Sequence, residues 1–258
     1  MESSTALVIF GDVVGSRRDS AGSTAWLRDL AAELNDAYAA SRLADFGFTQ
    51  GDEIQGLLAA DADPLVAVLH AALGGSARPI RWVCIWGGVD PAPPDDPATQ
   101  HTGSAFLRAR AAIEEARVGH DRLVIRTGRP DADALLGGMT PALMELLDDL
   151  TPTQRVVARL AIIEGLRQSE VAEKLNVRRA TISVSFARSK IAPLQRLIGA
   201  IRLVCRNEPV AAEPVESAES QVPAAVEPTE VRTLEGVDDA EWLTTGFGGR
   251  IEDRGSNR

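Results

Sequence analysis

The chain has 258 residues, of which 45% are hydrophobic and 25% are charged, with 22 glycines and 14 prolines. This composition is that of an ordinary globular protein and excludes collagen-like, coiled-coil and fully disordered chains. Two cysteines, Cys84 and Cys205, are too few for a disulfide framework, which favours a reducing compartment. Because the sequence shows neither a basic leader nor an apolar stretch of bilayer length, we expect a cytoplasmic protein with no membrane partner.

Charge is distributed unevenly along the chain. Residues 1–150 carry 12 Lys and Arg against 22 Asp and Glu, residues 151–205 carry 10 against 3, and residues 206–258 carry 5 against 12, so the net charges are −10, +7 and −7. A basic block between two acidic ones indicates a polyanion-binding segment. We therefore expect a domain at 1–130, a connecting helix at 131–150, a DNA-binding module at 151–205, and an acidic disordered tail at 206–258.

The first domain alternates between strand and helix patterns. The expected strands are Thr5–Phe10, Phe46–Thr49, Ile54–Leu58, Ile80–Val89 and Leu123–Ile125, and the expected helices are Ala25–Leu43, Pro64–Leu73 and Gly103–Arg117. The strand Ile80–Val89 is apolar on both faces, which is typical of a central strand. The first six elements run β-α-β-β-α-β, the order of a ferredoxin-like sandwich, so the sequence predicts an α+β fold.

Two Gly-Asp motifs fall at the ends of expected strands. Asp12 follows the first strand, while Asp52 and Glu53 lie in the tight connection between the second and third strands. Because the first and third strands of a ferredoxin-like sheet are neighbours, we expect these carboxylates to meet at one rim and to hold Mg²⁺ or Mn²⁺. The alternative is turn chemistry, in which each Asp bonds its own backbone.

A candidate phosphate-binding segment follows Asp12. Gly15 permits a close approach of backbone amides to an anion, and Ser16 and Arg17 come directly after it. These three residues are the predicted contacts for a nucleotide or another small phosphorylated ligand.

Both Asp motifs resemble the palm domain of class III nucleotide cyclases, in which two metal-binding Asp residues lie on a first strand and a hairpin. Asp12 and Asp52 match those two positions, and the stretch PIRWVCIWGGVD resembles the cyclases' fourth strand. Phe48 stands where a purine-selecting Lys is expected, and Leu107 stands where a transition-state Asn is expected. The resemblance therefore implies nucleotide binding with little or no cyclisation.

Three further stretches resemble the SatD family, an uncharacterised bacterial group. They are GDVVGSR, QGDEIQGLL and GSAFLRARAAIEEA, and the similarity covers roughly the first half of the chain. This resemblance implies a shared domain and supplies no established activity.

The basic block predicts a helix-turn-helix. Residues 151–154 (TPTQ) place a Thr cap, a Pro at the first helical position and a reciprocating Gln in a capping box. A second helix is expected over 168–175, and Asn176 follows in the turn, where Asn tolerates a left-handed backbone. The third helix is expected from Arg179 to Lys190, before Pro193 interrupts it.

In such a motif the N-terminal half of the last helix enters the major groove of duplex DNA. The predicted contacts with bases and phosphates are Arg178, Arg179, Thr181, Ser183, Arg188 and Lys190. The segment 150–190 resembles region four of bacterial sigma factors and the helix-turn-helices of response regulators, although Arg167 replaces the usual Ser or Thr cap. The alternative is a basic three-helix module that serves only protein contacts or dimerisation.

The sequence thus favours a cytosolic transcription regulator that binds double-stranded DNA and senses a phosphorylated ligand or Mg²⁺-nucleotide through its palm-like domain. The first alternative is an enzyme, a metal-dependent nucleotidyl cyclase, transferase or phosphohydrolase that the basic module localises. The second is a degenerate palm domain that acts as an interaction scaffold. A homodimer is a further expectation, since palm-type cyclases and most helix-turn-helix proteins are dimers.

Overall fold

The computed structural model describes residues 4–15, 20–48, 52–74, 78–93 and 96–206. All of them belong to one compact unit that extends from Met1 to Pro214. The candidate ligand contacts Ser16 and Arg17 lie outside the described residues, as does the expected tail beyond Arg206. In the described ranges, no helix combines the length and apolarity needed to span a bilayer.

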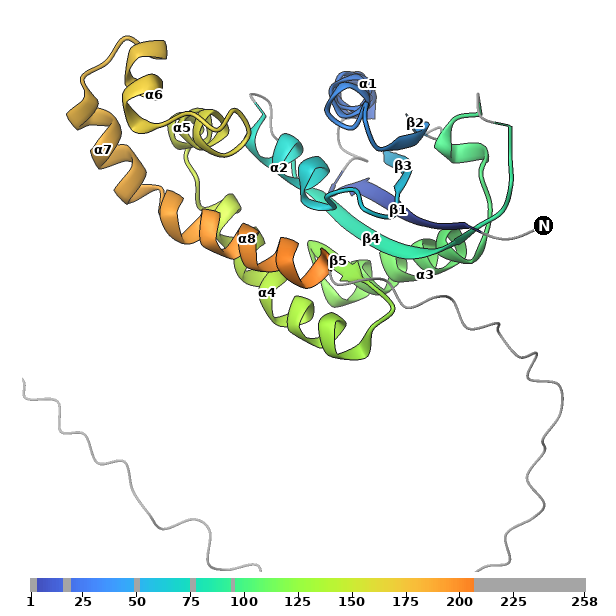
Figure 1. Cartoon of the computed structure of the whole chain (residues 1–258). Helices are drawn as coiled ribbons and strands as arrows, with labels where there is room; N and C mark the ends of the chain where they lie inside the picture. Colours follow the sequence, from blue (N-terminus) through green and yellow to red (C-terminus); the bar gives the residue numbers. More distant parts are fainter. Residues whose placement is uncertain (1–3, 16–19, 49–51, 75–77, 94–95, 207–258) are drawn as a thin grey trace, which may run out of the picture. The chain divides into compact units, whose positions relative to one another are not determined.

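The first part of the chain is α+β (Figure 1). Its strands are β1 (Ser4–Val13), β2 (Arg42–Phe48), β3 (Glu53–Ala59), β4 (Ile80–Val89) and β5 (Leu123–Arg126). Its helices are α1 (Ser20–Ala37), α2 (Leu65–Leu73) and α3 (Ser104–Gly119), with a 3₁₀ turn η2 (Ala98–Gln100) before α3. The chain therefore runs β1-α1-β2-β3-α2-β4, which is the element order that the sequence predicts.

The five strands form one mixed sheet in the order β2-β3-β1-β4-β5. The pairs β2–β3, β3–β1 and β1–β4 are antiparallel, and β4–β5 is parallel. The expectation that the first and third strands are neighbours is confirmed. In this register Asp12 lies between Glu53 on one side and Arg81 on the other.

Helices cover both faces of the sheet, so β4 is buried along its whole length. Side chains alternate along β1: Leu7 and Ile9 pack with residues of α1 and α2, while Val8 and Phe10 pack with residues of α3. Trp82 packs into the core on the α1 and α2 side. This two-sided burial confirms the prediction of a central strand.

The first helix is shorter than the sequence predicts. The expected helix extends to Leu43, but this residue lies on β2, where it is exposed while Ala44 and Phe46 are buried. In this segment buried and exposed residues alternate with the period of a strand, and this pattern decides the structure over the helical spacing of the apolar residues before it. Tyr38, which the helical pattern included, follows the end of α1, and its hydroxyl donates a 2.7 Å hydrogen bond to the carbonyl of Asp63.

The second part of the chain is helical. It comprises α4 (Pro130–Asp148), α5 (Pro152–Ile162), α6 (Gln168–Lys174), α7 (Arg179–Arg188) and α8 (Ile191–Arg206). The break between α7 and α8 comes at Lys190, which has a φ of 50°. The predicted helix from Arg179 to Lys190 corresponds to α7, but Pro193 is not the cause of the break, because this proline falls in the first turn of α8, where the missing N–H is tolerated.

Helix α8 packs back onto the first part of the chain. Its buried residues Ile191, Leu194, Ile198 and Ile201 share one hydrophobic core with α4 and with the α1 and α2 face of the sheet. The predicted DNA-binding module at 151–205 is therefore continuous, through its last helix, with the core of the α+β part.

Candidate nucleic-acid interface and carboxylate–arginine site

Helices α5, α6 and α7 enclose a small core of their own. It consists of Val157, Leu160, Val171, Ala172 and Ile182. The predicted capping box opens α5: the Gln154 backbone N–H donates to the Thr151 hydroxyl at 3.4 Å, and the Thr151 N–H donates to the Gln154 side chain at 2.9 Å. The start of the motif is thus set by local sequence chemistry.

The turn between α6 and α7 contains Asn176, whose φ of 51° confirms the predicted left-handed backbone. At the start of α6, Arg167 stands where a hydroxyl cap is usual, and the Glu170 side chain accepts a backbone hydrogen bond there instead. The backbone N–H of Arg167 donates to the Glu170 carboxylate at 2.7 Å. This hydrogen bond lowers the pKa of Glu170 below its usual value, since it stabilises the ionised form.

Ile182 is the one buried residue of α7, and the exposed residues of this helix include Arg179 and Arg188 as well as Val184. The six predicted DNA contacts are all exposed: Arg178, Arg179, Thr181, Ser183, Arg188 and Lys190. Arg179 and Ser183 are one turn apart and share a side of the helix. The structure therefore presents the N-terminal half of α7 to solvent, as groove entry requires.

Among the described residues, the arginines of this surface have no acidic partner. Arg178, Arg179 and Arg188 make no ion pair with any residue that the structure describes, whereas Lys190 lies 4.0 Å from Asp149. Exposed, uncompensated guanidinium groups are available to an external polyanion and displace its counterions on binding.

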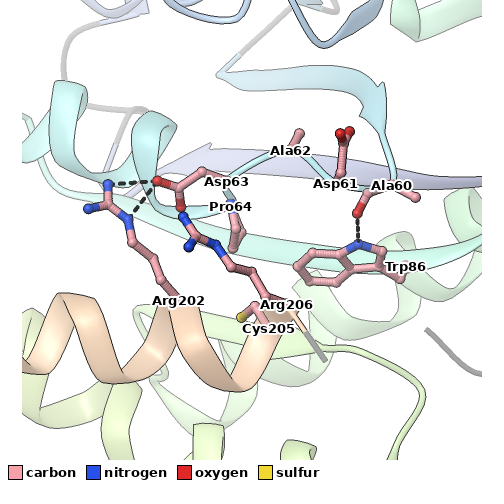
Figure 2. Close-up of a pocket in the computed structure, with 9 residues that line it drawn as sticks. All are labelled: Ala60, Asp61, Ala62, Asp63, Pro64, Trp86, Arg202, Cys205 and Arg206. Carbon is pink, nitrogen blue, oxygen red and sulfur yellow. Dashed lines mark hydrogen bonds and ion pairs between the residues drawn. The ribbon is translucent and has the colours of Figure 1, made fainter. Parts of the chain in front are cut away.

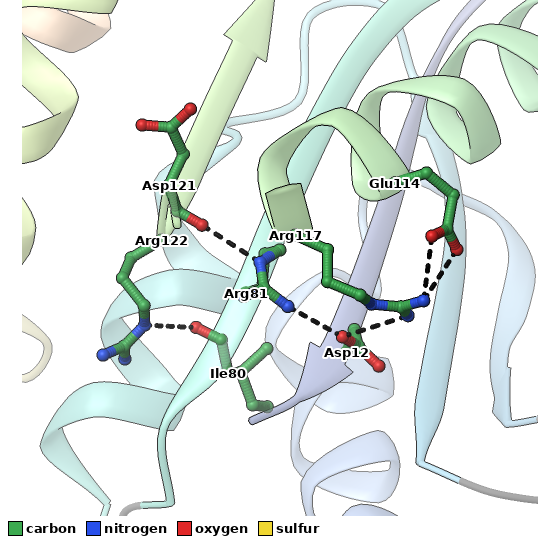
Figure 3. Close-up of polar contacts among 7 residues, drawn as sticks. All are labelled: Asp12, Ile80, Arg81, Glu114, Arg117, Asp121 and Arg122. Carbon is green, nitrogen blue, oxygen red and sulfur yellow. Dashed lines mark hydrogen bonds and ion pairs between the residues drawn. The ribbon is translucent and has the colours of Figure 1, made fainter. Parts of the chain in front are cut away.

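The second candidate site lies at the rim of the sheet where β1 ends (Figure 3). Asp12 is only 6% exposed, and its Oδ2 accepts a 3.0 Å hydrogen bond from Nη1 of Arg81. The same oxygen lies 3.4 Å from Nη2 of Arg117, on α3. Arg81 is itself buried, and its Nε donates to the carbonyl of Asp121 at 3.1 Å. Asp12 is therefore held in a buried ion pair.

Asp52 and Glu53 lie beside Asp12, as the sequence predicts. The N–H of Val13 donates to the Asp52 carbonyl at 3.0 Å, and Glu53 is the register partner of Asp12. The Glu53 carboxylate accepts from the Gln55 amide at 2.5 Å and lies 3.6 Å from Arg110. The three acidic residues thus meet at one rim, but arginines surround them.

At this rim the carboxylates and the guanidinium groups neutralise one another. Burial lowers the pKa of Arg117, but the carboxylates of Asp12, Glu114 and Asp52 raise it by more, so its pKa lies above the usual range. Arg117 is therefore a permanent cation at the mouth of the site, with about half of its side chain exposed (48%).

The residues of this rim do not fit a magnesium site in this arrangement. The Asp12 carboxylate is occupied by two guanidinium groups, and in the described part of the chain no group of three or more His, Cys, Asp or Glu side chains is placed to hold a metal ion. Binding of Mg²⁺ or Mn²⁺ by Asp12, Asp52 and Glu53 stays a prediction from the sequence.

Gly15, a predicted ligand contact, has a left-handed backbone. Its φ of +77° is a left-handed conformation that glycine adopts without strain, and no atom lies within 4 Å of the place where a Cβ would stand. The space that a side chain would fill at this position is therefore open with respect to the described residues around it.

Of the two positions that depart from the cyclase pattern, Phe48 pairs with Ile54, the residue after Glu53. Leu107 is 74% exposed on α3, and the Arg28 guanidinium lies 5.9 Å from the centre of the Phe48 ring. The sequence pattern did not identify Arg81 and Arg117, the two partners of Asp12. A signal for Arg81 was present, since it is the one charged residue in the apolar run of β4.

The comparisons with known proteins add little. No family model matches the chain, and no curated protein matches it. Among solved structures, the chain is similar to a regulator of polyketide synthase expression from Bifidobacterium adolescentis, with 15% identity over 81% of this chain and 83% of that chain and a TM-score of 0.25. Backbones that superpose so poorly give no grounds for transferring fold or function. The resemblances to the SatD family and to sigma-factor region four stay predictions.

Proposed function

We propose that this protein is a transcription regulator that inserts α7 into the major groove of double-stranded DNA. The observation that carries the proposal is the contrast on α7 itself. Ile182 anchors the helix in the core of the three-helix motif, while Arg178 and Arg179 stand exposed at its N-terminal end and pair with no acid in the described part of the chain. Such a regulator acts in the cytoplasm, and as a homodimer its two copies of α7 would read half-sites about one helical turn apart.

The α+β part is, in this proposal, a ferredoxin-like palm domain that senses a phosphorylated ligand. The antiparallel order β2-β3-β1-β4 is the order that this fold requires, with β5 added at the edge. Gly15 offers open backbone beside the rim, and Arg117 offers a half-exposed cation. A phosphate group would compete with Asp12 for Arg117 and would form stronger charge-assisted hydrogen bonds.

A direct link joins the two parts. The Glu33 carboxylate on α1 accepts a 2.5 Å hydrogen bond from Arg159 on α5 and lies 2.8 Å from Nδ1 of His70 on α2. Helix α5, the first helix of the DNA-binding motif, is therefore linked to α1 and α2, the two helices that cover one face of the sheet. A change in the palm domain can reach α5 through these contacts.

DNA binding is tested with the full-length chain, because α8 shares its core with α4 and an isolated 151–205 fragment would expose Ile191 and Ile201. Fluorescence anisotropy with a labelled duplex at fixed salt gives the affinity. We expect Arg179→Ala to weaken binding about tenfold, since it removes a phosphate or base contact. Arg126→Ala, the same change on β5, is the matched control and should bind as the wild type does. Equal affinities for all three proteins would contradict the proposal.

Ligand sensing is tested by thermal unfolding with ATP or GTP in the presence of a chelator. A ligand that binds only the native state raises the melting temperature, and we expect a rise of about 2–4 °C at ligand concentrations near ten times Kd. Arg117→Gln should lose this rise, and Arg126→Gln should keep it. A rise that requires Mg²⁺ and disappears in Asp12→Asn would favour the metal site instead, and no rise under any condition would contradict sensing.

A further inference from the structure

A cavity of about 460 Å³, whose lining residues Figure 2 shows, lies toward the other end of β1 from Asp12. Its walls are the loop from Ala60 to Pro64 between β3 and α2, the Trp86 side chain on β4, and the last turns of α8. Trp86 pairs with Leu7 of β1, five residues before Asp12, so roughly 17 Å of strand separates the cavity from the carboxylate rim. The two sites are therefore distinct.

The walls of this cavity are apolar. The indole N–H of Trp86 already donates a 2.7 Å hydrogen bond to the Ala60 carbonyl, so the ring presents hydrocarbon to the cavity. Pro64 is buried beside it. Burial raises the pKa of the Cys205 thiol to about 12, so this group stays neutral and packs as an apolar side chain. A ligand body here is held by contact with hydrocarbon.

The charged groups that line the cavity differ in whether they already have a partner in the described part of the chain. The Asp63 carboxylate accepts from Arg202 at 2.6 and 2.7 Å and from the Leu65 backbone N–H at 3.0 Å. Asp63 and Arg202 therefore already pair with each other. Arg206 also lines the cavity, is exposed, and makes no ion pair with the residues that the structure describes. In Figure 2 the Asp61 carboxylate points away from Trp86. The cavity therefore offers an uncommitted cation.

We propose that this cavity binds a small apolar carboxylate, with its hydrocarbon body against Trp86 and Pro64 and its carboxylate on Arg206. Cavities of 300 to 1,000 Å³ hold ligands of drug-like size, and this one lies in that range. A guanidinium group binds a carboxylate through two parallel hydrogen bonds, which fixes the orientation of the ligand.

Binding at this place would act on α8. The pair of Arg202 with Asp63 joins α8 to the loop before α2, and a ligand between them adds contacts to both. Since α8 follows α7 directly after Lys190, occupancy favours one position of the recognition helix. The binding step stands independently of the proposed function, whereas this consequence rests on it.

The test uses two fluorescent probes of similar ring structure with the full-length chain. 8-Anilinonaphthalene-1-sulfonate carries one negative charge, and N-phenyl-1-naphthylamine carries none. We expect the anionic probe to bind with one-to-one stoichiometry and Arg206→Gln to weaken it about tenfold, with little change for the neutral probe. Arg196→Gln, an exposed arginine on the same helix that does not line the cavity, is the matched control and should change neither.

Displacement of the anionic probe then identifies the ligand body. Competition by decanoate indicates a ligand with a linear hydrocarbon body, and competition by 2-naphthoate indicates one with an aromatic body. Either result supports the proposal. Failure of both to compete overturns it, as does equal binding of the anionic probe to the wild type and Arg206→Gln. Because neither readout involves DNA, a failure here is distinct from a failure of DNA binding.

Discussion

Arginines gather in two regions of this molecule, and their surroundings give them opposite roles. On α7, Arg178 and Arg179 are exposed and face no acid among the described residues. At the rim of the sheet, Arg81 is buried against Asp12, and Arg117 shares the same carboxylate. Pairing and burial, and not residue type, therefore separate arginines available to a polyanion from arginines that hold strands together.

The largest expected effect comes from breaking the buried pair at the rim. Asp12→Asn removes the charge that compensates Arg81, so we expect the free energy of unfolding to fall by about 3 kcal/mol. If Asp12 faced only the neighbouring carboxylates, the same substitution would relieve repulsion and leave the fold intact or slightly stabilised. Urea unfolding measures the change. The exposed Glu114→Gln is the control and should stay within about 0.5 kcal/mol, and an equally small change for Asp12→Asn would contradict the pairing.

A smaller effect is expected from the acidic tail. Residues 206–258 carry a net charge of −7, opposite in sign to the +7 of residues 151–205, and a tethered polyanion competes with DNA at high effective concentration. Truncation after Arg206, which leaves α8 whole, should raise DNA affinity about tenfold at low salt, and screening should reduce this gain as salt rises. Titrations of both proteins at two salt concentrations give the comparison, and identical low-salt affinities would rule out competition.

The smallest effect is expected at Glu33, which links α5 to the sheet's helices. Burial raises the pKa of Glu33, but Arg159 and His70 lower it by more, so the carboxyl titrates below its usual value of 4.5 in the folded state. This link therefore stabilises the fold above that value and is lost as pH falls through the lower folded-state pKa. Because Glu33 is partly exposed and screened, the contribution is below about 1 kcal/mol. Unfolding at pH 7 and pH 4 should show a smaller loss for Glu33→Gln than for the wild type, and equal losses would refute the link.

Features set by local chemistry could be predicted from the sequence. The capping box at Thr151, the left-handed Asn176 and the six exposed positions on and beside α7 follow from spacing and residue type over a few positions. The neighbouring positions of β1 and β3 followed from the order of elements. These predictions required no knowledge of distant contacts.

Features set by distant contacts could not be predicted. Arg81 and Arg117 lie far from Asp12 in sequence, and only the register of β4 and the position of α3 bring them together. The packing of α8 was hidden because Pro193 suggests a break, although a proline in a first turn is compatible with a helix. The sequence therefore predicted the exposed arginines at α7, but it did not predict that arginines pair with Asp12 at the rim of the sheet.

The salt dependence of DNA binding tests the central claim most directly. For the full-length chain, the slope of log affinity against log salt counts the phosphates neutralised, and each lost contact reduces it by about 1. The double variant Arg178→Ala/Arg179→Ala should lower the slope by about 2, whereas Arg117→Ala, at the rim, should leave it unchanged. Equal slopes for the wild type and the double variant, or a reduced slope for Arg117→Ala alone, would contradict the assignment of α7 as the DNA-binding helix.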